Sequence, residues 1–279
     1  MKHFIFGYGS LICPRSRSVT APTLQTAIAE PAMIKHIERM WSARILKGDS
    51  LVSNKNREHI RGWTPMGIRR RENASCNGVL IHVDDEELAR FDIREEGYKR
   101  NKIALIDVYR HYDYIDNSSA AADVLVLDGV RCQECRIVFE IAHKKRSDRR
   151  AGLIDDSDIA VWVYIQNEDC APNPSFPITQ SYVDVIMRGC LAVSKEFARM
   201  FLQTTHGWWQ EGEADRASNA NNDDESDKSA SQHHTWVDDR KCPMYIRADS
   251  DFSLENADTI DRMIEEHHPH AFKRRVVCI

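Results

Sequence analysis

The chain has 279 residues, of which 42% are hydrophobic and 29% are charged, and this composition is typical of a folded globular protein. Its formal net charge of −5 disfavours a nucleic-acid-binding domain, because such domains are normally basic. No apolar run is long enough to cross a bilayer, and the amino terminus has neither the apolar core nor the cleavage site of a secretory signal. We therefore expect a cytoplasmic protein whose partners include neither nucleic acid nor membrane.

The first predicted element is a short apolar strand from His3 to Phe6, which ends where Gly7 and Gly9 introduce a tight loop. Glycine allows close main-chain approach, so this loop can expose amide N–H groups. A dinucleotide-binding fingerprint would require a third glycine three positions after Gly9, but Ile12 stands there. Two interpretations remain: a structural turn, and a cradle of N–H groups that binds a carboxylate or an amide.

The following segments alternate between extended and polar chain. We expect extended chain from Ala32 to Ile45, and a long polar loop or a pair of irregular hairpins from Lys47 to Asn77. The β-branched run from Gly78 to Val83 predicts a strand.

A helix is predicted directly after this strand. Asp84 or Asp85 is expected to cap it, and Leu88 and Phe91 mark its buried stripe. Gly97 should end the helix shortly after Glu95.

The rest of the chain contains more strands than helices. Strand-like runs lie at Ile103 to Tyr109, Val124 to Leu127, Ile137 to Ile141 and Ile159 to Ile165. Helices are expected from about Gln180 to Leu191, after a cap at Ser194, and around Ile260 to Ile264. Because the helices do not alternate regularly with the strands, the pattern predicts an α+β fold: a curved mixed β-sheet or a small β-barrel with flanking helices.

The composition also predicts three regions. Residues 1–210 should form one domain, and residues 211–234 a disordered acidic and polar insertion with almost no apolar side chains. Residues 235–279 regain aromatic side chains and are expected to pack on the domain as a C-terminal extension whose end can be mobile.

The eight cysteines are too dispersed for a disulfide scaffold, and Cys132 and Cys135 form the only C-x-x-C pair. No second close pair exists to complete a zinc ribbon. The pair precedes the strand-like run at Ile137 rather than a predicted helix, which disfavours a thioredoxin-like site, so we expect reduced structural thiols. The histidines also lack ligand spacing, so no metal is expected; they are His233, His234, His267, His268 and His270.

A second motif accompanies the glycine loop. In Phe91-Asp92-Ile93-Arg94-Glu95-Glu96-Gly97-Tyr98 an acid, Glu95, stands at the end of the predicted helix. Together with Phe6-Gly7-Tyr8-Gly9-Ser10-Leu11, this segment resembles the γ-glutamylcyclotransferase superfamily, which includes the ChaC-type enzymes. The first motif is met in full, and the second, L-D-x-x-E in the family, is met with Phe91 in place of leucine.

The resemblance continues through other segments of the chain. Arg39-x-Trp41 and Cys76 to Leu80 match the family with fair specificity. Residues Pro177 to Asp184 and Trp236 to Arg240 are only loosely similar to its longer members. About half of the chain is covered, and the acidic insertion is not.

The resemblance implies a reaction in which the α-amine of a γ-glutamyl group attacks its own γ-carbonyl carbon. The products are 5-oxoproline and a free amine. Because both reacting groups belong to one molecule, neither a cofactor nor a metal is needed, and well-oriented intramolecular reactions reach effective molarities of about 10⁵–10⁸ M. The family's proton acceptor falls on Glu95.

The resemblance also assigns substrate-binding residues, which are Tyr8, Gly9, Ser10, Leu11 and Tyr98. The loop could bind either the substrate α-carboxylate or the developing oxyanion. Tyr98 could equally be a core tyrosine. The expected partner is a small γ-glutamyl compound, whether glutathione, another γ-glutamyl amino acid or a γ-glutamyl amine.

Two other functions fit the same motifs. A non-catalytic relative would bind γ-glutamyl compounds without turnover, and a transferase would pass the γ-glutamyl group to an external amine. The leaving group and the oligomeric state stay open at this stage.

Overall fold

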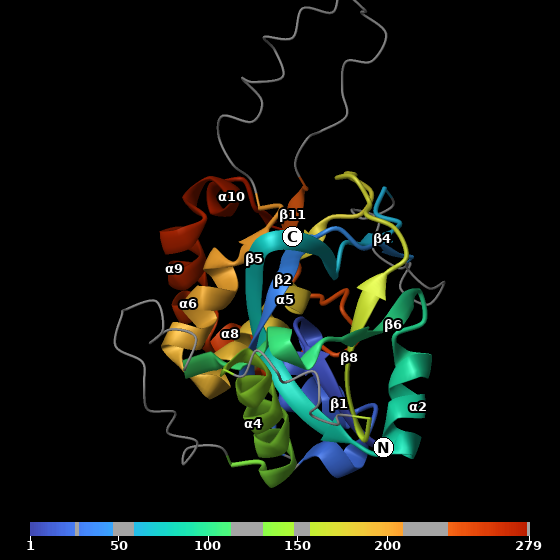
Figure 1. The fold of residues 1–279 in the computed structure, drawn as a ribbon. Helices are drawn as coiled ribbons and strands as arrows, with labels where there is room; N and C mark the ends of the chain where they lie inside the picture. Colours follow the sequence, from blue (N-terminus) through green and yellow to red (C-terminus); the bar gives the residue numbers. More distant parts are fainter. Residues whose placement is uncertain (26–27, 47–58, 113–130, 148–156, 209–233, 278–279) are drawn as a thin grey trace, which may run out of the picture. The chain divides into compact units, whose positions relative to one another are not determined.

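The computed structural model describes residues 1–25, 28–46, 59–112, 131–147, 157–208 and 234–277 (Figure 1). The chain forms two compact units. The first unit contains Met1–Arg39, Ile68–Asn167 and Gly189–Thr204, and the second contains Met40–Gly67, Glu168–Arg188 and Thr205–Ile279. The predicted regions 1–210, 211–234 and 235–279 stay a prediction, and residues 211–233 lie outside the described residues.

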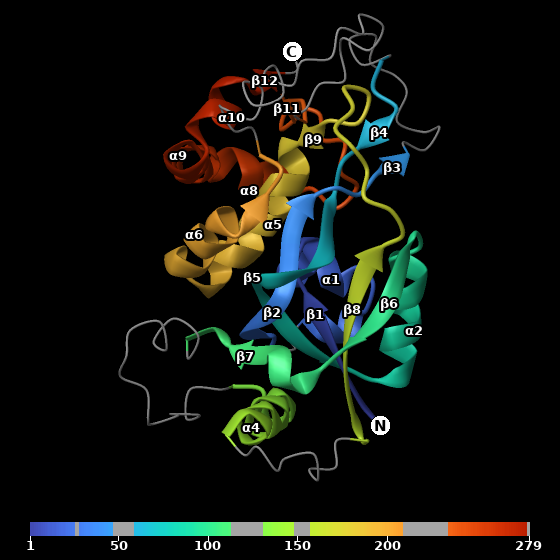
Figure 2. The same ribbon diagram turned by 45° about the horizontal axis from the view of Figure 1, so that its top comes forward.

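A mixed β-sheet forms the centre of the first unit (Figure 2). Its order is β2-β5-β1-β8-β6, and β7 also pairs with β2. The strands are β1 (Lys2–Gly7), β2 (Glu30–Trp41), β5 (Met66–Val83), β6 (Tyr98–Ile103), β7 (Val108–Arg110) and β8 (Ile159–Gln166). Strand β1 runs antiparallel to β5 and parallel to β8. The α+β class with a mixed sheet is thus confirmed, whereas the described strands form an open order and no barrel; the curvature stays a prediction.

Strand β1 lies between β5 and β8, and its apolar residues explain this central position. Phe4, Ile5 and Phe6 are at most 1% exposed, so the strand is buried on both faces. Continuous apolar runs are typical of strands covered on both sides. Phe6 pairs with Leu80 and Gly7 with Val79. The loop that follows Gly7 therefore starts from a fixed point at the centre of the sheet.

Helix α2 (Asp85–Arg94) begins with a complete capping box. The carboxylate of Asp84 accepts a hydrogen bond from the Glu87 amide at 2.8 Å, and the Glu87 side chain accepts from the Asp84 amide at 3.0 Å. Leu88 and Phe91 are buried, as the sequence predicted. Glu95 is the C-cap residue, and Gly97 follows with φ of 96°, a left-handed conformation that favours glycine.

The prediction of a strand from Ile137 to Ile141 is wrong, because this segment lies in helix α4 (Gln133–Ser147). Its buried residues are Cys135, Val138, Phe139 and Ala142. Their spacing of three and four residues is that of a helix stripe, and this period outweighs the β propensity of the isoleucines. Helix α4 packs beside β7 and the short 3₁₀ helix η5 (Leu105–Asp107). The C-x-x-C pair therefore stands at the start of a helix, and the expectation that it precedes a strand is wrong.

The predicted polar loop from Lys47 to Asn77 is also wrong in its second part, because β5 begins at Met66. The middle of β5 is polar and exposed, yet it lies beside β2 in the sheet. Arg69 and Arg71 both form ion pairs with the buried Glu38 of β2, the Arg69 pair at 2.7 Å. Cross-strand pairs of this kind stabilise a strand that has no apolar pattern of its own.

Other expectations have mixed outcomes. The run from Ile103 to Tyr109 is divided among β6, η5 and β7, and Val124 to Leu127 lies outside the described residues. The strand near Ile159 and three helices are confirmed. These helices are α5 (Gln180–Val193), α6 (Lys195–Gln203) and α9 (Ala257–His267), and the Ser194 hydroxyl caps α6 by accepting from the Phe197 amide at 3.0 Å.

The second unit contains short strands, C-terminal helices and an aromatic core. Besides α9 it contains β3 (Ile45–Leu46), β4 (Gly62–Trp63), β9 (Ile178–Thr179), β10 (Thr205–His206), β11 (Trp236–Asp238), α8 (Ser250–Glu255), α10 (Pro269–Lys273) and β12 (Val276–Val277). Strand β11 pairs in parallel with both β9 and β12. Trp208 packs edge-on against Trp41 and near Trp236, with ring centroids 5.0 and 5.2 Å apart. Trp208 is therefore a core residue of this unit.

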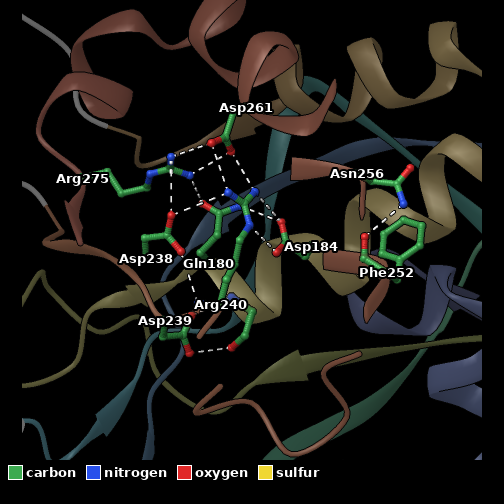
Figure 3. A network of polar contacts seen from close by, with 10 residues as sticks. Gln180, Asp184, Asp238, Asp239, Arg240, Phe252, Asn256, Asp261 and Arg275 are labelled. Atoms are coloured by element: carbon green, nitrogen blue, oxygen red, sulfur yellow. Dashed lines mark hydrogen bonds and ion pairs between the residues drawn. The ribbon is translucent and has the colours of Figure 1, made fainter. Parts of the chain in front are cut away.

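A buried ionic network joins the two C-terminal segments that are loosely similar to the family (Figure 3). Arg240 pairs with Asp184 of α5 at 2.8 Å and with Asp261 of α9 at 2.7 Å. Arg275 binds the same Asp261 at 2.6 Å. Asp184 is fully buried, and Arg240 is almost so. The two segments therefore contribute Asp184 and Arg240 to one ionic network, which Asp261 and Arg275 complete.

Candidate active site

The glycine loop continues directly into a tight helical turn. Residues Ser10–Ile12 form a 3₁₀ helix, closed by a 2.9 Å hydrogen bond from the Ile12 amide to the Gly9 carbonyl. Gly7 leaves room for this turn, because a Cβ at that position would lie 2.8 Å from the Leu11 Cβ. Helix α1 (Pro14–Ser18) follows almost at once. Loop and helix thus fold as one short compact segment.

Two buried arginines hold the main chain of this loop. Arg39 donates to the Tyr8 carbonyl at 3.4 Å, and Arg17 donates to the carbonyls of Leu11 and Ile12 at 3.3 and 3.0 Å. Arg39 is fully buried, and Arg17 is 3% exposed. Burial lowers the pKa of Arg17 to about 10. The carbonyl groups on both sides of Gly9 and Ser10 are therefore bound by protein donors.

Arg39 also connects the loop with helix α6. Its guanidinium donates to the carbonyl of Asn77 at 2.6 Å, to the side chain of Asn77 at 2.9 Å and to the Phe201 carbonyl at 2.9 Å. The amide of the Asn77 side chain donates to the Phe197 carbonyl at 2.8 Å. The matches at Arg39 and at Asn77, far apart in the sequence, are thus parts of one hydrogen-bonded group.

Glu95 lies at the carboxyl end of α2 and contacts the neighbouring arginine. Its carboxylate is 3.0 Å from Nε of Arg94, and its side chain is 18% exposed. The terminal Nη2 of the same arginine donates to the Ser10 hydroxyl at 3.1 Å. One guanidinium therefore contacts both the predicted proton acceptor and the predicted binding loop, and the two sequence motifs meet at this point.

Arg94 is held in place by further contacts with α1. It donates to the carbonyl and hydroxyl of Ser16 at 2.7 and 3.0 Å, and to the hydroxyl of Thr20 at 3.0 Å. Its side chain is only 4% exposed. A guanidinium with this many partners has little rotational freedom, so it fixes the direction from which its Nε faces Glu95.

Tyr8 and Tyr164 form a second connection between the loop and α2. The Tyr8 hydroxyl donates to the main-chain carbonyl of Tyr164 at 2.6 Å, and the Tyr164 hydroxyl donates to Asp92 at 2.8 Å. Burial, the hydrogen bond to Asp92 and the negative charge of Glu95 raise the pKa of Tyr164. Tyr164 therefore stays protonated at neutral pH and acts as a donor near Glu95.

Asp92, the first acid of the second motif, is an anchor for the end of the helix. Besides the bond from Tyr164, it forms a 2.7 Å ion pair with Arg100 of β6. Tyr98, at the start of β6, is half-buried, and its amide donates to the Glu95 carbonyl at 2.9 Å. Of the predicted binding residues, Ser10 is thus bonded to Arg94 of α2, whereas Tyr8 reaches α2 only through Tyr164. Tyr98 lies next to Glu95 through the main chain.

Sequence reasoning missed three residues of this arrangement. Arg94 stands at a variable position of the second motif, and Arg17 has no recognisable sequence signal. Tyr164 lies in the apolar run of β8, where a lone tyrosine looks like a core residue. Only its hydrogen bond to Asp92 in the folded protein distinguishes Tyr164 from an ordinary core tyrosine.

No group of three or more histidine, cysteine or acidic side chains among the described residues could hold a metal ion. His233, one of the histidines weighed in the sequence, lies outside that part of the chain.

Within the residues that the structure covers, no helix has the length and apolar character needed to span a bilayer.

Comparisons with known proteins give only distant matches. No family model matches the sequence, and no curated protein does so. Among solved structures, a γ-glutamyl cyclotransferase is similar at 12% identity with a TM-score of 0.41, over 72% of this chain and 86% of that one. An uncharacterised protein from Homo sapiens is similar at 11% identity with a TM-score of 0.40, over 75% and 91%.

A third solved structure is a γ-glutamyl cyclotransferase from yeast that is specific to glutathione. It is similar at 11% identity with a TM-score of 0.29, over 73% of this chain and 86% of that one. The solved structures similar to this chain thus include γ-glutamyl cyclotransferases.

Proposed function

We propose that this chain is a cofactor-independent γ-glutamylcyclotransferase in which Glu95 is the proton acceptor and the loop from Tyr8 to Leu11 binds the γ-glutamyl group. The observation that carries the proposal is the position of Arg94, whose guanidinium contacts Ser10 and Glu95 at 3.1 and 3.0 Å. Both motifs of the family resemblance thus contact one guanidinium, and this contact supports the proposal that they act on one substrate.

The chemistry requires the removal of one proton before the ring can close. Glu95 takes a proton from the substrate α-ammonium, and the free amine then attacks the γ-carbonyl carbon. The bond from this carbon to the leaving nitrogen breaks as the same carboxyl returns the proton to that nitrogen. The ring nitrogen gives up its second proton to the released amine, which leaves as an ammonium ion. The carboxylate form of Glu95 is the one that can accept a proton, and the Arg94 guanidinium lies 3.0 Å from it.

The Tyr8 hydroxyl has a defined role in this proposal. Its single hydrogen is donated to the Tyr164 carbonyl, so towards a substrate its oxygen can act only as an acceptor. An acceptor next to the loop suits the α-ammonium of the γ-glutamyl group. The Ser10 hydroxyl and the loop amides would then bind the α-carboxylate or the oxyanion.

The decisive experiment is the mass-spectrometric detection of 5-oxoproline from a panel of glutathione, γ-glutamyl-alanine and γ-glutamyl-lysine. The unchanged protein should release 5-oxoproline from at least one of these compounds. Glu95→Gln should reduce the rate by at least about 10²-fold, the scale of general-base catalysis, while the protein stays folded. Glu96→Gln is the matched control, because Glu96 is the exposed neighbour outside the motif and should keep its activity.

The same panel separates this proposal from its alternatives. Binding of γ-glutamyl compounds without any product would indicate a non-catalytic relative. Product that forms only when an external amine is added, without 5-oxoproline, would indicate a transferase. Full activity of Glu95→Gln would contradict the assigned role of that carboxylate.

A further inference from the structure

The C-x-x-C pair lies at the start of helix α4, away from the residues of the proposed site in the sequence. The Cys132 carbonyl accepts the first hydrogen bond of the helix, from the Arg136 amide at 3.1 Å, and Cys135 lies in the first turn. The Cys135 amide donates to the sulfur of Cys132 at 3.4 Å. The pair is therefore close enough to react internally.

The environment makes the two sulfurs chemically unequal. Hydrogen bonding with Cys135, including the bond from its main-chain amide, lowers the pKa of Cys132. Burial and the Glu134 carboxylate, 3.6 Å from the Cys132 sulfur, oppose this effect. The hydrogen bond with Cys132 and burial raise the pKa of Cys135. Cys132 keeps 8% exposure, whereas Cys135 is fully buried. In thiol–disulfide exchange the attacking thiol should be ionised and accessible, and the second thiol should be protected. Cys132 fits the first description and Cys135 the second.

We propose that Cys132 and Cys135 form a reversible intramolecular disulfide by exchange with a low-molecular-weight disulfide. The Cys132 thiolate attacks one sulfur of that molecule, forms a mixed disulfide and releases the first small thiol. Cys135 then loses its proton and attacks the sulfur of Cys132, which releases the second small thiol. The protein loses two protons and two electrons, and the small disulfide gains both to become two thiols.

Two other buried cysteines do not share these properties. Cys76 and Cys190 are fully buried, and burial raises the pKa of both, that of Cys76 to about 11. Cys242 is exposed. It supplies an accessible thiol outside the pair for comparison.

Oxidation also has a structural consequence within the sheet. In the reduced protein the Cys135 thiol donates to the Leu80 carbonyl of β5, with sulfur and oxygen 3.6 Å apart. A disulfide removes this hydrogen, so the bond to Leu80 is lost. Leu80 pairs with Phe6, which precedes the glycine loop.

The test uses the full chain equilibrated with hydroxyethyl disulfide and 2-mercaptoethanol at a series of ratios. These reagents contain no γ-glutamyl group, so the proposed cyclotransferase activity cannot consume them, and the result does not depend on it. After acid quenching and alkylation, peptide mass spectrometry should find the 132–135 peptide lighter by two hydrogens at oxidising ratios and fully alkylated at reducing ratios. A pair that stays alkylated at every ratio would overturn the proposal.

Single variants test the order of attack. Cys135→Ser should accumulate a mixed disulfide on Cys132, whereas Cys132→Ser should leave Cys135 unmodified. The control Cys242→Ser should leave the titration of the pair unchanged. A mixed disulfide on Cys135 in the Cys132→Ser variant would contradict the assigned roles.

Because Cys135 is fully buried, its variant can fail to fold, and the unchanged protein then supplies the evidence. The alkylation rate of Cys132 as a function of pH should have its midpoint below about 8.5, the value for a free cysteine. A midpoint at or above that of Cys242 would contradict the proposal.

Discussion

Buried arginines stabilise both units of this molecule, but they bind different kinds of partner. In the first unit, Arg17 and Arg39 donate to main-chain carbonyls around the glycine loop and α6. In the second unit, Arg240 and Arg275 bind carboxylates of α5 and α9. A carbonyl left without its donor loses a hydrogen bond, whereas a buried carboxylate left without its cation keeps an uncompensated charge. The two groups should therefore respond differently to substitution and to pH.

The largest effect is expected for Arg240→Met. This change leaves Asp184 buried without its cation, and breaking such a pair costs about 3–5 kcal/mol in the free energy of unfolding. Urea denaturation measures the loss. As a control, Arg136→Met removes an exposed pair with Glu140 on α4 and should cost less than about 1 kcal/mol. Equal losses of unfolding free energy in the two variants would show that burial does not determine how much the network stabilises the protein.

A smaller effect is expected for Arg39→Lys, which keeps the charge but loses the planar fork that binds the main chain. Several buried acceptors lose their donor at once, so we expect a loss of about 2–4 kcal/mol. Because the Tyr8 carbonyl is one of these acceptors, kcat/KM for 5-oxoproline release should fall as well. Arg70→Lys, an exposed change on β5, is the control. Unchanged activity in Arg39→Lys would separate this arginine from the proposed site.

The third prediction uses pH. Fully buried His111 packs against Phe197, and burial lowers its pKa to about 4. The unfolded chain binds a proton near pH 6.5, which the folded protein does not, so stability is complete above that pH and falls as the pH decreases towards 4, by about 3 kcal/mol. His111→Phe should remove this loss in denaturation curves, whereas His206→Gln, an exposed change, should keep it.

The second unit should respond to acid in a different range. Burial alone would raise the pKa of Asp261, but hydrogen bonds from Arg275 and Arg240 outweigh it and lower the pKa. The contribution of Asp261 is therefore present above its unfolded pKa of about 3.9 and is lost as the pH falls below it. We assign the loss of stability above pH 5 to His111 and the loss below about pH 4 to Asp261. A loss above pH 5 that persists in His111→Phe would contradict this assignment.

The smallest effect is expected for Asp84→Ala. Asp84 binds a main-chain group, as Arg39 does, but at an exposed helix end, so its removal should cost only about 1 kcal/mol. Asp85→Ala, one residue later and without the capping bond, is the control. If Asp84→Ala lost as much stability as Arg39→Lys, burial would not determine how much a hydrogen bond to the main chain contributes.

Local signals explain what could be predicted from the sequence. Helix α2 was predicted because its cap, apolar stripe and terminal glycine all lie within about one dozen residues. The polar part of β5 was missed because its stabilising partner, Glu38, lies on another strand. Helix α4 was misread because two isoleucines outweighed the helical spacing from Cys135 to Ala142.

The candidate site likewise contains residues that a local motif reveals and residues that only tertiary contacts reveal. Ser10 and Glu95 were predicted as site residues, and their roles stay a prediction, but each belongs to a short motif that a sequence displays directly. The side chain that contacts both of them, Arg94, could not be identified, because its contacts with Ser10 and Ser16 exist only after α1 and α2 have packed. Residues that act through tertiary contacts leave no periodic or local signal.

Gly78 of β5 lies beside Gly7, the last residue of β1, and limits which substitutions this protein can accept. A Cβ on Gly78 would lie 2.5 Å from the Gly7 oxygen and 2.5 Å from the Phe6 ring. Since one of these obstacles is main chain, no compensating side-chain replacement elsewhere can relieve it. Variant libraries of this protein should therefore keep Gly78 constant, because a side chain there cannot be accommodated by changes at other positions.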